Sequence, residues 1–201
     1  RGVSLAATGD GWAVGAGGRS LHFDGFPWSV VAPGVTDDLL DVWGSAEDDA
    51  FAVGAGGTIL SWDGAAWVAQ DSGVTANLHG VWGTLGADVY AVGEAGTILH
   101  FDGVAWSPMA SGVNVDLLAI WGTSSADVYA VGEAGTILHF DGTVWSPLRN
   151  DSPQTLRGLG GSSATDVTAV GDDGGILRFT RQLPGAEGGE CARPVEAYCE
   201  T

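Results

Sequence analysis

The tripeptide Ala-Val-Gly occurs five times in this chain, and each copy begins 39 residues after the previous one. The glycines that end the five copies are Gly15, Gly54, Gly93, Gly132 and Gly171. No insertion or deletion interrupts the spacing. A fixed period of roughly 20–50 residues is typical of proteins built from one repeated supersecondary unit. The five copies are therefore expected to fold alike.

The third copy shows the content of one unit most clearly. Its segments 78–83, 88–93, 96–101 and 106–110 are rich in β-branched and aromatic residues, and Gly, Asp, Ser or Pro separate them. This pattern predicts short strands joined by tight turns, and no segment has a sustained helical period. Each repeat is thus expected to form one four-stranded antiparallel sheet.

Five such sheets predict an all-β fold, a five-bladed β-propeller of 39-residue, four-stranded antiparallel repeats. The strands are almost continuously apolar, which is typical of sheets covered on both faces, as propeller blades are. A solenoid of β-hairpins is the alternative architecture. The propeller is predicted over residues 1–182, and residues 183–201 leave the repeat as an irregular tail.

The two end repeats depart from the others at one aromatic position. Trp43, Trp82 and Trp121 recur in register, whereas Ser4 and Gly160 stand at this position in the first and fifth repeats. Such a loss is expected where a ring closes or is capped. The sequence leaves open whether residues 1–5, the tail or further chain closes the ring.

The charge balance limits the partners. The chain has 25 acidic residues and seven basic ones, giving a formal net charge of −18. Nucleic acid is excluded as a partner because phosphate binding needs a positive surface. No apolar run approaches the roughly 20 residues of a membrane helix, so membrane insertion is not expected. As a domain, the chain is expected to be monomeric.

The tail contains both cysteines. Cys191 and Cys199 can form only one intramolecular disulfide, which would close a small loop. A bridge of this kind is typical of secreted proteins. It predicts an extracellular or cell-surface location.

Aspartates recur at two turn positions of the unit. One precedes the second strand of each repeat, and the other stands before Gly between the third and fourth strands. Because Asp accepts hydrogen bonds from backbone N–H groups and Gly supplies positive φ, we interpret the second set as structural turns. These residues are Asp24, Asp63, Asp102 and Asp141.

The segments 22–28 and 101–106, with the sequences HFDGFPW and FDGVAW, resemble the Asp-box, or BNR, hairpin of β-propellers. The strands before them resemble those of assembly-factor propellers of photosynthetic membranes. The complete unit looks like a tandem repeat of secreted myxobacterial proteins, although Asp and Gly adjoin here where the usual Asp-box separates them. The resemblance implies the fold and no particular activity, because such hairpins occur on unrelated proteins.

The same resemblance raises the question of catalysis, because sialidases contain Asp-boxes. They use an Arg triad, a Tyr nucleophile and a Glu base, but this chain has no Arg between Arg19 and Arg149. Histidines that share one repeat position, His22, His100 and His139, would diverge around a ring and could not meet at one metal ion. The sequence therefore predicts no enzyme, no cofactor and no metal site.

The positions that escape the repeat are the best candidates for function. In an antiparallel blade, the loop before the first strand and the turn between the second and third strands open on the same face. Loops on a rigid scaffold are where binding residues concentrate. The candidate ligand-binding residues on this face are Glu94, Glu133, Asp172, Asp173, Asp38, Asn77, Asp116, Arg149 and Arg157.

These residues predict a non-catalytic binding module that recognises a protein through one propeller face. The alternative is a glycan-binding lectin with sites between the blades, because tryptophan and aspartate both recur in the unit. The partner is accordingly an unknown protein or glycan.

Overall fold

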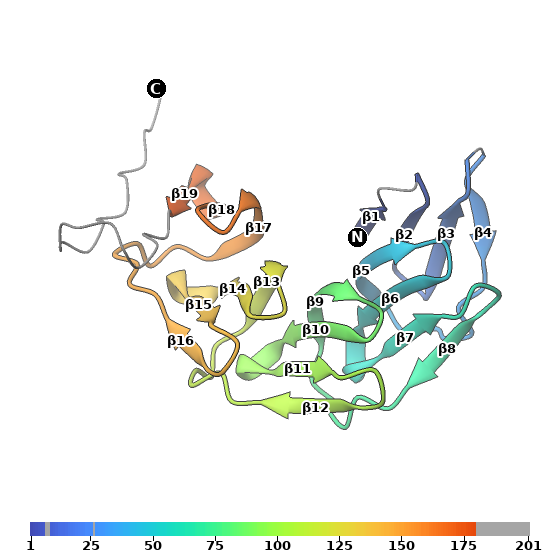
Figure 1. Cartoon of the computed structure of the whole chain (residues 1–201), viewed down its shortest axis with the longest axis horizontal. Helices are drawn as coiled ribbons and strands as arrows, with labels where there is room; N and C mark the ends of the chain where they lie inside the picture. The colour runs from blue at the N-terminus through green and yellow to red at the C-terminus, as the bar shows by residue number, and fades with distance from the viewer. Residues whose placement is uncertain (7–8, 26, 180–201) are drawn as a thin grey trace.

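The computed structural model describes residues 1–6, 9–25 and 27–179, so the predicted tail and its cysteines lie outside the described residues. The described part contains five antiparallel sheets, four with four strands and the last with three (Figure 1). Three-residue 3-10 turns are the helical elements of this part. The predicted all-β propeller fold with five repeated blades is confirmed.

Each blade follows the strand order of the sequence. Blade 1 contains β1 (Gly2–Leu5), β2 (Gly11–Gly15), β3 (Arg19–Phe23) and β4 (Ser29–Val31). Blade 2 contains β5 (Leu39–Ala46), β6 (Asp49–Gly54), β7 (Ile59–Trp62) and β8 (Trp67–Gln70). Blade 3 contains β9 (Leu78–Leu85), β10 (Asp88–Gly93), β11 (Ile98–Phe101) and β12 (Trp106–Met109). Blade 4 contains β13 (Leu117–Ser124), β14 (Asp127–Gly132), β15 (Ile137–Phe140) and β16 (Trp145–Pro147), and blade 5 contains β17 (Leu156–Ser163), β18 (Asp166–Gly171) and β19 (Ile176–Phe179).

The five blades follow one another along an open arc (Figure 1). The first strands of the blades, β1, β5, β9, β13 and β17, lie side by side on the inner side of this arc. The third and fourth strands lie toward its outer side. Blade 1 and blade 5 stand at the two ends, and their described residues face each other across the opening of the arc.

The core lies in the seams between consecutive blades. The earlier blade of a seam contributes its second strand, joined in blades 2 to 4 by the isoleucine that begins its third strand, and the later blade contributes residues from several of its strands. The seam between blades 2 and 3 buries Phe51, Val53 and Ile59 of the first against Leu78, Val81, Val89, Ala91, Leu99 and Trp106 of the second. Because both faces of a blade are covered in this way, its strands are apolar throughout, as the sequence predicted.

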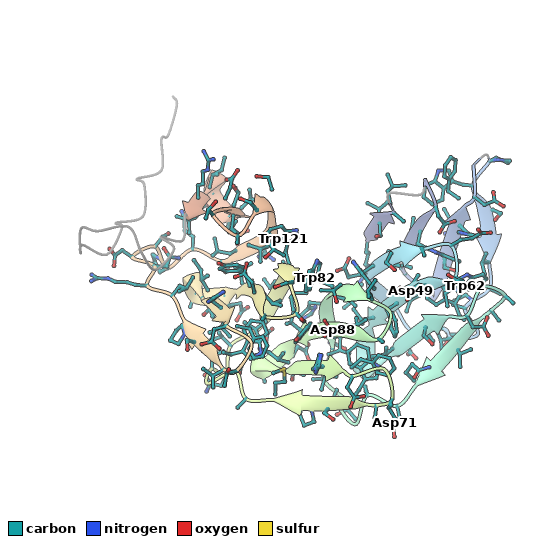
Figure 2. The ribbon with its side chains drawn as sticks, viewed as in Figure 1. Asp49, Trp62, Asp71, Trp82, Asp88 and Trp121 are labelled. Atoms are coloured by element: carbon teal, nitrogen blue, oxygen red, sulfur yellow. The ribbon has the colours of Figure 1, made fainter. Side chains whose placement is uncertain are left out.

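The inner-strand tryptophans lock consecutive blades together. A Cβ on Gly83 would lie 2.9 Å from the ring of Trp43, and one on Gly122 would lie 2.7 Å from the ring of Trp82. Trp121 approaches Gly161 in the same manner. Each of these rings therefore occupies space that only glycine leaves free on the following blade. Figure 2 shows the labelled Trp82 and Trp121 on the inner side of the arc.

Candidate functional site

The loops that were expected to open on one face do meet there. They are the segments 32–38, 72–77, 111–116 and 150–155, which lead into the inner strands, and the 3-10 turns that join the second and third strands. These turns are η1 (Ala55–Gly57), η2 (Glu94–Gly96), η3 (Glu133–Gly135) and η4 (Asp172–Gly174). Backbone N–H groups of Ala55 and Glu94 donate to the carbonyls of Asp38 and Asn77 at 2.9 and 3.0 Å. We call this surface the rim face.

Three of the predicted binding residues connect neighbouring blades across the rim face. Asp38 Oδ1 accepts the N–H of Gly17 at 2.8 Å, and Asn77 Oδ1 accepts the N–H of Gly56 at 2.8 Å. Asp116 Oδ1 accepts the N–H of Ala95 at 2.9 Å. In each pair the acceptor precedes an inner strand and the donor lies in the turn of the preceding blade. These side chains therefore brace the scaffold with one of their oxygens.

Glu94 is also engaged within the rim face. Its carboxylate accepts the side-chain amide of Asn77 at 2.6 Å and the backbone N–H of the same residue at 3.1 Å. Asn77 thus has both of its side-chain polar groups occupied. The pair fixes the start of β9 to turn η2.

The two predicted arginines form ion pairs on the rim face. Arg157 contacts both carboxylate oxygens of Asp172, at 2.5 and 3.0 Å. This hydrogen bonding lowers the pKa of Asp172 and raises that of Arg157. Arg149 contacts Asp151 at 3.0 Å, and its side chain is 88% exposed. Both pairs are exposed, so they orient the side chains more than they stabilise the fold.

Glu133 and Asp173 are the most available of the predicted residues. Both are exposed, and neither carboxylate forms a hydrogen bond or ion pair with the residues that the structure describes. Asp173 also has a positive φ of 56°, which is uncommon for a residue with a side chain. The structure therefore places one free carboxylate on blade 4 and one on blade 5.

The inner strands add three residues, Leu40, His79 and Leu118, that the predicted set of binding residues lacked, next to Arg157, which it contained. The pairing of β5, β9, β13 and β17 with their second strands shifts by one residue near the rim face, which leaves a bulge in each strand. The bulged residues are Leu40, His79, Leu118 and Arg157. β-Bulges re-aim side chains and are enriched next to functional sites. The sequence signal was the residue type at this repeat position, which is Leu, His, Leu and Arg in blades 2 to 5.

The opposite end of the blades holds a repeated polar network. His100 Nε2 lies 2.7 Å from Asp88 Oδ1, and Thr84 donates its hydroxyl to Asp88 Oδ2 at 2.7 Å. Blades 1 and 4 carry the equivalent histidine contacts, His22 to Asp10 and His139 to Asp127, each at 2.7 Å. The network joins three strands of one blade. The hydroxyl contacts the carboxylate and not the imidazole, which differs from a serine-protease arrangement.

The Asp-Gly turns lie at this same end. Asp63 Oδ1 accepts the N–H groups of Ala66 and Ala65 at 2.8 and 2.9 Å, and these bonds lower the pKa of its carboxyl. Asp102 and Asp141 make the same pair of bonds, with the same lowering of their pKa. Each of these three carboxylates closes its own hairpin. Asp24 holds the same place in the hairpin of blade 1.

The repeated outer tryptophans fill the seams. Trp67, Trp106 and Trp145 are 8%, 9% and 8% exposed, and each ring packs on an aromatic side chain of the preceding blade. Their faces are therefore not open to a sugar ring. Trp28, on the first blade, is 41% exposed because no blade precedes it in the described structure.

No group of three or more His, Cys, Asp or Glu side chains in residues 1–6, 9–25 and 27–179 is placed to hold a metal ion. Within those ranges, no helix has the length and apolar character needed to cross a membrane.

The fold and the rim face define a β-propeller built from tandem four-stranded blades. No family model matches the sequence, and no curated protein matches it either. Among solved structures, the chain resembles YCF48 from Cyanidioschyzon merolae at a TM-score of 0.70 and 14% identity, over 96% of this chain and 70% of that one. It also resembles YCF48 bound to D1 peptide, at a TM-score of 0.65 and 19% identity. That match covers 89% of this chain, which spans 62% of the length of its neighbour.

Proposed function

We propose that this chain is a non-catalytic module that binds a protein or peptide segment on the rim face. The carrying observation is the bulged position at the rim face, which holds Leu40, His79, Leu118 and Arg157 in blades 2 to 5 and so presents apolar, aromatic and cationic side chains from equivalent places on the scaffold. A scaffold role alone gives no reason for this variation. Variable side chains on a rigid frame are what a binding surface requires.

The chemistry of the rim face favours a partner with mixed character. Leu40 and Leu118 supply apolar contacts, His79 supplies a ring donor, and Arg157 supplies a cation. Glu133 and Asp173 add exposed carboxylates at the edge. Together these groups fit the backbone and side chains of a polypeptide better than a uniformly charged ligand. The solved YCF48 complex, whose partner is a D1 peptide, supports protein binding as a use of this fold.

The burial of the repeated tryptophans favours a protein partner over a glycan. Lectins of this architecture would need exposed tryptophan faces next to polar loops. Here the repeated outer tryptophans are 8–9% exposed in the seams of blades 2, 3 and 4. The lectin alternative therefore has less support, and a glycan array tests it directly.

Selection of peptides from a random displayed library on the purified chain tests the function. We expect selected peptides to lose at least tenfold in affinity when His79, Leu118 and Glu133 are all replaced by alanine, because each loss of about 1.4 kcal/mol is tenfold. A matched control replaces Glu47 and Val104, which lie in turns at the opposite end of the blades. Peptides that bind both variants equally well would show that the rim face is not the site.

We also propose an extracellular or cell-surface location, supported by the two cysteines of the tail. Cell fractionation combined with thiol labelling before and after reduction tests this. Protein found in the cell interior with both thiols reduced would contradict it.

A further inference from the structure

The two ends of the arc expose side chains that every interior seam buries. On blade 1, Val3 is 67% exposed, whereas its counterparts Val42, Val81 and Ile120 are 3–8% exposed. Leu21 and Trp28 are 36% and 41% exposed, although the corresponding leucines and tryptophans of blades 2 to 4 are 0–9% exposed. We call the surface formed by Val3, Leu21 and Trp28 the leading face.

Blade 5 presents the other half of a seam. Val170 is 47% exposed, against 0–4% for Val14, Val53, Val92 and Val131. Ile176 is 58% exposed, against 1–5% for Ile59, Ile98 and Ile137. In the interior seams, residues at these positions pack on the leading-face positions of the next blade. We call the surface formed by Val170 and Ile176 the trailing face.

Neither face resembles the capping end of a repeat protein. Capping repeats turn a polar surface to solvent. The leading and trailing faces keep the apolar residues of interior seams, and apolar surfaces of this kind mark interaction sites. Their two sets of residues are also complementary, because each is one half of the same contact.

We propose that both faces bind further blades of the same 39-residue type, which complete the ring and are supplied by polypeptide beyond residues 1–201. The two propeller chains that this one resembles are longer, since the match spans 62% and 70% of them. Two more repeats bring the chain close to their length.

The end blades also define what their neighbours must look like. Leu5 stands at the position of Gly83, Gly122 and Gly161, which accept the tryptophan ring of the preceding blade. A tryptophan from the blade before blade 1 would collide with Leu5, so that blade must carry a small residue there. At the other end, Gly160 stands at the repeat position of the inner-strand tryptophans, so blade 5 presents no tryptophan ring to a following blade. A Cβ built on Gly160 would have no neighbouring atom within 4 Å. The blade after blade 5 can therefore carry a larger residue than glycine.

The test extends the full chain by two repeats. A copy of residues 40–117 placed directly before Arg1 continues the register, because residue 40 and residue 1 share one repeat position. Two versions are compared, one with the copied Trp82 retained and one with Trp82→Gly in the copy. We expect the glycine version to unfold at the higher temperature and to bind several-fold less of an apolar dye than the 201-residue chain.

A substitution reports directly on the leading face. Val3→Asp should shift the unfolding midpoint of the 201-residue chain by no more than about 2 °C, because the side chain is 67% exposed. In the extended chain the same change should lower the midpoint by about 10 °C, since it buries a charge. Val42→Asp, in an interior seam, is the matched control and should cause the large loss in both chains.

Two outcomes would overturn the proposal. One is an extended chain that folds cooperatively, responds to Val42→Asp and yet tolerates Val3→Asp as well as the shorter chain does. The other is a 201-residue chain that sediments as a discrete dimer and dissociates on Val3→Asp or Ile176→Asp. That result would make a second copy the occupant of the faces.

Discussion

Single side chains decide how well the polar groups of the seams are satisfied. Trp67 donates its indole N–H to Ser20 Oγ at 3.1 Å, and Ser20 donates to the carbonyl of Val31 at 2.7 Å. The counterparts of Ser20 in the next two blades are Ile59 and Ile98. The buried indole N–H groups of Trp106 and Trp145 consequently have no partner in the described structure. At this repeat position, Ser20 of blade 1 accepts a hydrogen bond from the tryptophan of the next blade, whereas Ile59 and Ile98 of blades 2 and 3 bury an apolar side chain instead.

Replacing Ser20 with alanine should destabilise the chain by about 1–2 kcal/mol, because Trp67 then joins Trp12, Trp106 and Trp145 as a buried indole without a hydrogen-bond partner in the described structure. Chemical denaturation measures the change, and Ser29→Ala, at an exposed position, is the control. A loss no larger than that of the control would show that the serine bond contributes little.

Asp41 brings a carboxylate into an inner-strand seam. Its Oδ2 accepts the N–H of Val81 on the next blade at 3.0 Å. Burial nevertheless dominates and raises the pKa of Asp41 from 3.8 to about 6. The folded chain therefore holds this proton more tightly than the unfolded chain does.

The stability that Asp41 contributes should be greatest below pH 4 and should fall as the pH rises through about 6. Asp41→Asn keeps an oxygen acceptor for Val81 without the charge. We expect it to stabilise the chain by about 2 kcal/mol at pH 8 and to have little effect at pH 4. Urea denaturation at the two pH values measures this. An equal effect at both would rule out the charge as the cause.

At the scale of the element, the 3-10 turns carry the tightest backbone constraints. Their middle residue has a positive φ, which is 52° for Ala95 and for Ala134. The glycine that follows, Gly96, has a positive φ of 71° as well, and a close contact adds a second constraint. A Cβ on Gly96 would lie 2.2 Å from the carbonyl oxygen of Val113, so the turn packs against the loop that leads to the next blade.

These two neighbours should respond in opposite directions. Ala95→Gly relieves the positive φ and should stabilise the chain by up to about 1 kcal/mol. Gly96→Ala should cost more than about 2 kcal/mol, because the backbone of the adjacent loop must move. Thermal unfolding of both variants provides the measurement. If Gly96→Ala were as stable as the parent chain, the loop contact would not be a constraint.

Elements of this kind show what the sequence could and could not predict. The 39-residue spacing predicted the strands, because turn residues and β-branched runs are local signals. The bulge at His79 could not be predicted, because it arises from the register between two strands. The bracing role of Asp38 and Asp116 was missed for a related reason. Their donors lie 21 residues away in another blade, and only the folded arc brings them together.

At the scale of the whole molecule, stability is a sum of seams between neighbours. A linear array of repeats gains its stability from each unit and from each nearest-neighbour contact. The seam between blades 4 and 5 has the smallest buried cluster, formed by Val131, Ile137, Leu156 and Ala169. In the seam between blades 3 and 4, ten buried side chains make the equivalent cluster. Among the described residues, the arc is therefore held together least firmly at blade 5.

Native-state hydrogen exchange should reflect this gradient. Amides of β18 are expected to exchange at least tenfold faster than those of β10, because blade 5 opens without breaking the central seams. Mass spectrometry of peptides from the two strands gives the comparison, with β14 as an internal reference. Equal protection of all three strands would indicate a single cooperative unit.

The contact between an inner tryptophan and the next glycine gives the array a direction. Trp43 meets Gly83 as Trp82 meets Gly122, so a recombination event that duplicates or deletes one interior unit recreates the same junction. Gene rearrangement can thus change the number of interior units without any compensating mutation. Leu5 and Gly160 do not follow this rule, so blades 1 and 5 cannot be exchanged with blades 2 to 4. The units from blade 2 to blade 4 can therefore vary in copy number, while blades 1 and 5 keep their places.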